Sequence, residues 1–115
     1  MAFKRFENQG GKSSNPLPML SIWKRGAAGF NIAAYELCNL DKYSFIETYF
    51  DEITNRIGFR FVPGKTAFSR SLSKRPSGCT FALRAFLKYH KIDYSAVKKY
   101  RLEFDEANNL FFIQL

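Results

Sequence analysis

Two Lys-Arg pairs, Lys24-Arg25 and Lys74-Arg75, are the residues whose types and spacing point most directly to a chemistry. Each pair follows a serine, Ser21 or Ser71, at the same spacing, and small residues come after each pair. Lysine and arginine neutralise the phosphates of a nucleic acid, and an arginine can also bind a guanine edge through two hydrogen bonds. The repeated pairs therefore indicate a nucleic-acid contact that is made twice.

Further basic residues are expected to widen this contact. From Pro63 to Ile92 the sequence has no acidic residue. The candidate nucleic-acid-binding residues are Trp23, Lys24, Arg25, Arg70, Lys74, Arg75, Arg84 and Lys88. Trp23 is expected either to stack on a base or sugar or to cover a neighbouring strand, and both interpretations stay open. A basic cluster can also be no more than a solvated face.

The composition favours polyanions as partners and gives no sign of catalysis. The 115 residues carry a net charge of +8, which favours nucleic acid, acidic lipid or an acidic protein. No nucleophile elbow, phosphate-binding loop or metal-ligand cluster stands out, so we expect no enzyme, no cofactor and no metal site. The carboxylate pairs Asp51-Glu52 and Asp105-Glu106 are expected at solvated hairpin tips.

The remaining chemistry-bearing residues have ordinary structural interpretations. Cys38 and Cys79 form no disulfide framework, and we expect both to be buried and reduced. His90 is expected to be partly exposed at the end of a short helix. No apolar run approaches the ~20 residues that span a bilayer, and the first residues lack a signal-peptide core. The sequence thus predicts a cytoplasmic protein that does not enter the membrane.

The elements that must position the Lys-Arg pairs also repeat. The pattern predicts two copies of strand, turn, strand, short helix and β-hairpin, spanning residues 19–62 and 68–115. In the first copy we expect a turn at Gly26–Gly29, a second strand at Phe30–Ile32, and Asn31 as the helix N-cap. The two Lys-Arg pairs are expected at corresponding strand ends, where a pseudo-two-fold axis presents them symmetrically.

Apolar spacing predicts the faces of the later elements. Ala33, Leu37 and Leu40 are expected on one helix face, and the second helix, with Leu83, Phe86 and Leu87, is expected to be slightly longer. Strands are predicted at Ser44–Phe50, Ile57–Val62, Phe68–Arg75, Gly78–Phe81 and Leu110–Leu115, and another strand is predicted to place Tyr100, Leu102 and Phe104 on one face. Residues 1–15 are expected to form a flexible basic arm, and residues 16–115 a single domain.

The order of these elements resembles the swapped-hairpin barrels of the AbrB, SpoVT, MazE and MraZ superfamily of transcription factors. The resemblance covers residues 19–62 and 68–115 and depends on element order and on Gly29, Leu37, Leu40 and Asp51. It implies a mainly β fold (β-rich α+β) in which tandem β-β-α-β-β units form a pseudo-two-fold swapped-hairpin-like barrel. The family's Gly-Arg turn is replaced here by Gly29-Phe30-Asn31 and Gly78-Cys79-Thr80.

The sequence therefore predicts a protein that binds double-stranded DNA through symmetric basic hairpins, in the manner of a transcriptional regulator. Its expected state is a pseudo-dimeric monomer or a higher homo-oligomer. The alternative is a non-enzymatic protein-interaction module, such as an antitoxin-like or mobile-element accessory protein, that binds an acidic partner. Convergence of the four Lys-Arg residues on one face favours DNA, whereas scatter beside an exposed apolar patch favours a protein. Single-stranded nucleic acid would require several exposed aromatic residues within the basic face.

Overall fold

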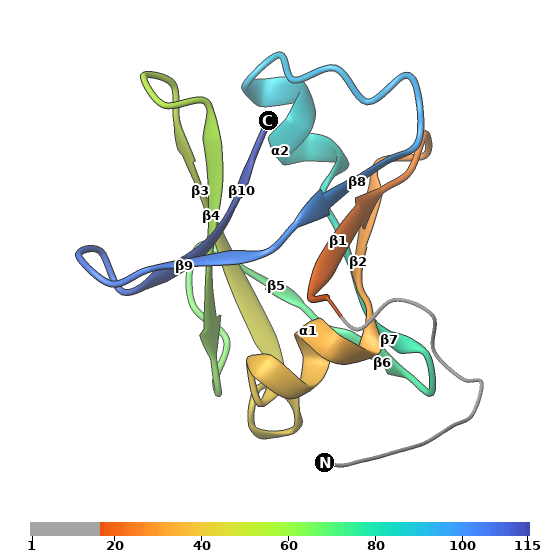
Figure 1. Cartoon of the computed structure of the whole chain (residues 1–115), viewed down its shortest axis with the longest axis vertical. Coiled ribbons are helices and arrows are strands. Elements are labelled where there is room, and N and C mark those ends of the chain that lie inside the picture. Colours follow the sequence, from red (N-terminus) through yellow and green to blue (C-terminus); the bar gives the residue numbers. More distant parts are fainter. Residues whose placement is uncertain (1–16) are drawn as a thin grey trace, which may run out of the picture.

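The computed structural model describes residues 17–115, so the predicted arm at 1–15 lies outside the described residues (Figure 1). The described chain is mainly β, as predicted, with short strands and two α-helices. In chain order the elements are β1 (Met19–Ile22), β2 (Ala27–Phe30), α1 (Ile32–Leu37), the 3₁₀ turn η2 (Leu40–Lys42), β3 (Phe45–Asp51), β4 (Arg56–Val62), β5 (Ser69–Ser71), β6 (Ser73–Arg75), β7 (Gly78–Ala82), α2 (Arg84–Tyr89), β8 (Lys98–Arg101), β9 (Glu103–Asp105) and β10 (Leu110–Gln114).

The strands form two antiparallel five-stranded sheets, and each sheet takes strands from both predicted repeats. Sheet 1 has the order β6-β7-β2-β1-β8, and sheet 2 has the order β5-β3-β4-β10-β9. At the centre of each sheet a strand of one repeat pairs with its counterpart, β2 with β7 and β4 with β10. One outer pair of each sheet also crosses between repeats, because β1 pairs with β8 and β3 pairs with β5. The repeats are therefore interleaved rather than merely adjacent.

Two bent segments run from one sheet into the other. The strand predicted at Phe68–Arg75 is interrupted at Leu72, so that β5 belongs to sheet 2 and β6 to sheet 1. In the same way β8 and β9 are separated by Leu102. The Leu72 N–H donates to the carbonyl of Ser44 and the Leu102 N–H donates to that of Pro18, both at 2.9 Å. These hydrogen bonds hold each bend against a neighbouring segment of the same chain.

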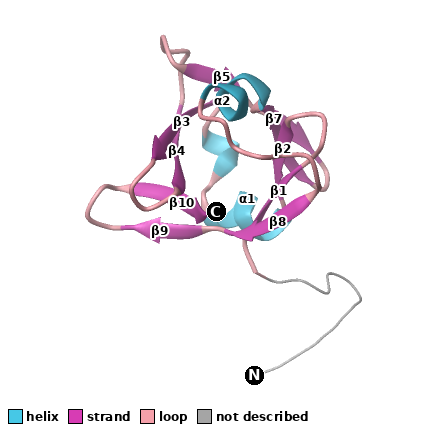
Figure 2. Ribbon diagram, turned by 90° about the horizontal axis from the view of Figure 1, so that it is seen from above, coloured by secondary structure: helices cyan, strands magenta, loops and turns pink. Residues whose placement is uncertain are grey.

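The two helices lie at opposite ends of the space between the sheets (Figures 1 and 2). Asn31 is the N-cap of α1, as predicted, and its side-chain oxygen accepts a hydrogen bond from the Ala34 N–H at 2.9 Å. Both helices have six residues, so the prediction of a longer second helix is wrong. Such short helices do not persist alone, and their stability depends on docking against the sheets.

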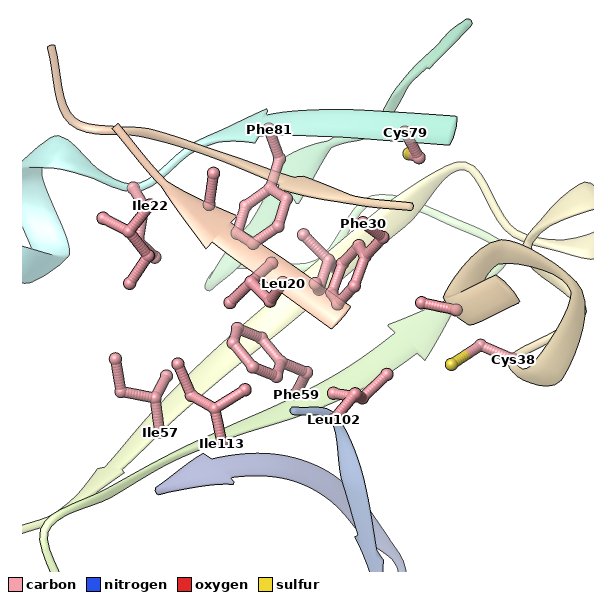
Figure 3. Packing of buried hydrophobic residues seen from close by; sticks show 14 of the residues in the cluster. Leu20, Ile22, Phe30, Cys38, Ile57, Phe59, Cys79, Phe81, Leu102 and Ile113 are labelled. Atoms are coloured by element: carbon pink, nitrogen blue, oxygen red, sulfur yellow. The ribbon is translucent and has the colours of Figure 1, made fainter. Parts of the chain in front are cut away.

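The core is formed by apolar side chains from the facing sides of both sheets and from the helices (Figure 3). Phe30 and Phe81 of sheet 1 stack with ring centroids 5.5 Å apart. Phe59 of sheet 2 meets both rings edge to face, at 5.6 and 6.0 Å. Cys38 and Cys79 are buried free thiols, as predicted. The aromatic contacts join the sheets at their centres, where strands of the two repeats meet.

The predicted turn at Gly26–Gly29 is displaced in the structure. The turn is formed by Trp23–Gly26, because the Trp23 N–H donates to the Ala27 carbonyl and the Gly26 N–H donates to the Trp23 carbonyl. Gly26 has a φ of +88°, which glycine adopts more easily than other residues. The second strand therefore begins at Ala27 and not at Phe30.

The predicted apolar face of the first helix is also wrong in part. Leu40 is fully buried, but Leu37 is 51% exposed, and the buried residues beside it are Ala34 and Cys38. The α-helix ends at Leu37 and a 3₁₀ turn follows, so helical spacing does not continue to Leu40.

Candidate nucleic-acid interface

The first Lys-Arg pair lies in the turn between β1 and β2. Lys24 and Arg25 are exposed there. Gly26 of the same turn lies against Arg84, since a Cβ on Gly26 would be 2.4 Å from the Arg84 Cβ. The Leu83 N–H, just before α2, donates to the Gly26 carbonyl at 2.9 Å. Three of the predicted basic residues therefore gather at this end of sheet 1.

The second Lys-Arg pair lies within β6 and not in a turn. In the first hairpin Ser21 pairs with Gly29, and in the second Ser73 pairs with Thr80. Arg75, two residues after Ser73, therefore corresponds to Trp23 and not to Arg25. The matched Ser-Lys-Arg spacing is thus two residues out of register with the hairpins, and the expectation that the pairs lie at corresponding strand ends is wrong.

The two pairs also lie at opposite ends of sheet 1. Because β2 and β7 are antiparallel, Ala27 lies opposite Ala82, whereas Arg75 pairs with Gly78 at the other end of β7. Four residues of β7 separate these ends, which is about 13 Å at ~3.3 Å per residue. Lys74 moreover donates to the Asp41 carbonyl, with 3.3 Å between the nitrogen and the oxygen. The four residues therefore do not converge on one point.

A row of small side chains crosses the outer face of sheet 1. Directly opposed residues of antiparallel strands point to the same side, so Ser73, Thr80, Gly29 and Ser21 form one line across four strands, and Lys99 follows Ser21 on the fifth strand. Residues that alternate with this line, such as Leu20 and Phe30, are buried in the core. The outer face is therefore flat at its centre, with its basic side chains around it.

Trp23 lies across the centre of this face. A Cβ on Gly29 would be 2.5 Å from the outermost carbon of the indole, and the methyl group of Thr80 lies nearby. The Arg25 guanidinium carbon lies 5.2 Å from the centroid of the indole. From the other end of the sheet, the Arg75 Nε approaches the Thr80 hydroxyl at 3.5 Å. Trp23 thus covers the neighbouring strands, and Arg25 and Arg75 flank it.

Two further basic residues of this face were missed by the sequence reasoning. Lys99 lies opposite Ser21 and Arg101 lies opposite Met19, and both side chains are exposed. The sequence does indicate that both side chains lie on the exposed face of a strand, because Lys99 and Arg101 alternate with the apolar residues Tyr100 and Leu102. It gave no indication that this strand would pair with β1. We call Trp23, Arg25, Arg75, Lys99 and Arg101, with the row of small residues, the basic face.

Five predicted residues are not part of the basic face as defined: Lys24, Arg70, Lys74, Arg84 and Lys88. Arg70 belongs to β5 of sheet 2, where it lies opposite the buried Ile46. Its Nε is buried and has no hydrogen-bond partner among residues 17–115. Lys88 is exposed on α2, one helical turn after Arg84. Neither Arg70 nor Lys88 belongs to a strand of sheet 1.

Charge is divided unequally between the two sheets. The strands of sheet 1 contain no aspartate or glutamate. The strands of sheet 2 contain Glu47, Asp51, Glu103 and Asp105. The outer face of sheet 1 is therefore the surface of the described chain where a polyanion meets least repulsion.

A cavity of about 380 Å³ lies beside Arg75, between α1 and the β6–β7 hairpin. Its lining includes Tyr35, Glu36 and Asp41. The Tyr35 hydroxyl donates to the Asp41 carboxylate at 2.5 Å, and this hydrogen bond raises the pKa of Tyr35 to about 12. The two carboxylates make the Arg75 end of sheet 1 less favourable for a phosphate than the Arg25 end.

The predicted turn carboxylates have structural partners. The Asp51 carboxylate accepts hydrogen bonds from the backbone of Ile53 and Thr54, and hydrogen bonding from Thr54 lowers its pKa. Asp105 is held in the same way by Asn108, which lowers its pKa too. Within residues 17–115, no three His, Cys, Asp or Glu side chains gather where they could hold a metal ion. His90 ends α2 and is half-buried, as predicted.

None of the helices in the described part of the chain has the length and apolar character needed to cross a membrane. No protein-family model matches this chain, and no curated protein and no solved structure gives a significant match.

Proposed function

We propose that the chain binds double-stranded DNA through the basic face of sheet 1. One observation carries the proposal: exposed basic side chains surround a flat outer face whose strands hold no carboxylate. Lysine and arginine on such a surface neutralise phosphates, and the released counterions supply most of the affinity. At the centre of the face the Trp23 indole packs over Gly29 and offers an apolar surface to a sugar of the backbone.

The dimensions of the face favour a duplex. Arg25 and Arg75 extend from opposite ends of a stretch of about 13 Å, at ~3.3 Å per strand residue. The major groove of B-DNA is about 12 Å wide, so the two arginines can reach the backbones on either side of it. Lys99 and Arg101 add contacts along one strand of the sheet.

Single-stranded nucleic acid fits this face less well. Sites for single strands stack successive bases on several aromatic side chains. Trp23 supplies one such ring in the basic face, and the outer edge of that ring lies against Gly29 of the neighbouring strand. We therefore assign Trp23 to packing against the DNA backbone or a sugar.

We also propose that the chain has the swapped-hairpin-like fold of the AbrB, SpoVT, MazE and MraZ superfamily. The bent segments at Leu72 and Leu102, and the exchange of outer strands between repeats, support a swapped-hairpin-like barrel. A role in transcription regulation follows from that resemblance. The DNA contact depends on the basic face alone.

The test is fluorescence anisotropy of a labelled duplex at several salt concentrations. The variant Arg25→Ala/Lys99→Ala/Arg101→Ala removes three charges from the basic face. The matched control Lys42→Ala/Arg60→Ala/Lys65→Ala removes three exposed charges from elsewhere in the chain. We expect the slope of log affinity against log salt to shrink by about 0.9 for each phosphate that is no longer neutralised, in the first variant only.

An equal loss of affinity in both variants would show that the basic face is not the binding surface. Absence of binding to the duplex at low salt would overturn the proposal. The basic face would then be assigned to an acidic protein, which is the alternative that the sequence leaves open. A labelled single strand of the same length is the comparison for the preferred form of DNA, and tighter binding to it would contradict the assignment to a duplex.

A further inference from the structure

The bent strand formed by β8 and β9 carries a charge pattern that the DNA contact does not use. Leu102, at the bend, is only 3% exposed, and the residues that alternate with it point away from the core. These outward residues are Lys99 and Arg101 on one side of Leu102 and Glu103 and Asp105 on the other. Two positive charges are thus followed by two negative charges along one exposed edge.

Most of these charged side chains are unpaired within the part of the chain that the structure describes. The side chains of Lys99, Arg101 and Glu103 have no hydrogen-bond or ion-pair partner among the described residues, although their backbones pair within the sheets. Asp105 accepts hydrogen bonds from Asn108 but meets no basic side chain at ion-pair distance within residues 17–115. The pattern therefore presents free charge of both signs to a partner.

We propose that this edge is a self-complementary docking surface for a second copy of the chain. In a two-fold dimer, a residue that contacts another is contacted by that residue's own copy in return. Positions 101 and 103, like positions 99 and 105, are equally distant from Leu102. Antiparallel docking about Leu102 therefore places Arg101 against Glu103 of the second copy, and Lys99 against Asp105 of the second copy.

The arrangement makes the expected dimer weak and sensitive to salt. Ion pairs between exposed side chains contribute little individually, and ionic strength screens them. The contact follows β8 and β9, which are edge strands of sheet 1 and sheet 2. Association is therefore expected at low salt and high protein concentration and disappears as salt is added.

Self-association also bears on the proposed DNA contact, and this part of the inference depends on that proposal. Lys99 and Arg101 belong both to the basic face and to the docking edge. A second copy covers them, so DNA and the second copy compete for the same side chains. The dimer is then a state with reduced affinity for DNA.

The test is sedimentation velocity of the whole chain over a concentration series at low and at high salt. Arg101→Glu and Glu103→Lys each place like charges opposite one another in the dimer, and we expect each variant alone to remain monomeric. An equal mixture of the two variants restores opposite charges and is expected to form a heterodimer. The double variant Arg101→Glu/Glu103→Lys is expected to dimerise like the wild type. Lys42→Glu and Glu52→Lys are the control changes of the same charge away from the edge.

A wild type that stays monomeric at low salt throughout the series would overturn the proposal. Control variants that weaken association as much as the edge variants would do the same, as would a mixture that fails to associate. The DNA measurement is separate. Glu103→Lys is expected to bind a labelled duplex more tightly than the wild type, and absence of duplex binding in every variant would refute the DNA contact while sedimentation still decides the dimer.

Discussion

At the scale of single residues, the position of Trp23 depends on the lack of a side chain at Gly29. The indole occupies the space that a Cβ on Gly29 would need, with only 2.5 Å between them. The contacting atom is at the far end of a side chain that can rotate, so the indole can move away at little cost in stability. Gly29 therefore determines how flat the basic face is. It also determines how much of the Trp23 indole is exposed to solvent.

We expect Gly29→Ala to lift the indole from the sheet while leaving the fold intact. Trp23 is the only tryptophan in the sequence, so its fluorescence reports on this position alone. The emission maximum should shift to the red, because more of the indole meets water, and iodide should quench it more strongly. Gly64→Ala is the control, since nothing lies within 4 Å of a Cβ there. An unchanged emission spectrum in Gly29→Ala would contradict the placement of Trp23.

At the scale of elements, Asn31 joins the first strand to the first helix. Its side-chain oxygen accepts from the backbone N–H of Ala34 and from that of Met19, at 2.9 and 3.1 Å. Its side-chain nitrogen donates to the Leu17 carbonyl at 2.9 Å. One side chain thus caps α1 and fixes the start of β1.

We expect Asn31→Ala to lower the free energy of unfolding by about 1–2 kcal/mol, as the removal of other N-caps does. Asn31→Asp keeps the accepting oxygen and removes only the hydrogen bond to Leu17, so it should destabilise the protein less. Urea unfolding followed by circular dichroism measures both variants. If both variants were destabilised equally, the cap would not be the source of the effect.

The elements that the sequence predicted correctly depend on local chemistry. The hairpin tip at Asp51-Glu52 was predicted from its turn residues, and Asn55 of the same loop has a φ of +58°. Strand β4 was predicted from the alternation of Ile57, Phe59 and Phe61, the first two of which are fully buried. Patterns within a few residues were therefore sufficient for β4, for the tip of the β3–β4 hairpin and for the N-cap of α1.

The predictions that were wrong concern positions that are set by strand pairing between residues far apart in the sequence. The matched Ser-Lys-Arg spacing gave no sign that Arg75 corresponds to Trp23, because hairpin register is set by pairing and not by residue type. The antiparallel pairing of β2 with β7 then separated Arg25 from Arg75. Lys99 belongs to the basic face only because β8 pairs with β1 of the other repeat.

At the scale of the whole molecule, the two cysteines report on global unfolding. Burial raises the pKa of the Cys38 thiol to about 12, and burial raises the pKa of Cys79 as well. The folded protein therefore holds these protons where the unfolded chain, with a thiol pKa of about 8.5, releases them. For Cys38 this contribution to stability is complete below about pH 8.5 and is lost as the pH rises towards about 12, and that of Cys79 is lost in the same direction.

We expect both thiols to resist a thiol-specific reagent at about pH 8, a little below the pKa of a free thiol, and to react when urea unfolds the chain. We also expect the urea midpoint to fall between about pH 8.5 and about pH 9.5, below the range where tyrosines titrate. In the variant Cys38→Ala/Cys79→Ala the urea midpoint should decrease less over this pH range, whatever the effect of the substitutions on stability at neutral pH. A double variant with the same pH dependence as the wild type would exclude the thiols as its cause.

The interleaved strands also determine what counts as a folding unit. Residues 19–62 alone would hold the hairpins β1–β2 and β3–β4 with the short α1 and η2 between them, and isolated two-stranded hairpins are marginal in water. Neither repeat is therefore a domain, and folding is an association between the two halves of one chain. The exposed segment 63–68 that joins them sets their effective concentration. A connection too short to let the halves meet would transfer the same pairing to a neighbouring chain, giving two chains that exchange halves.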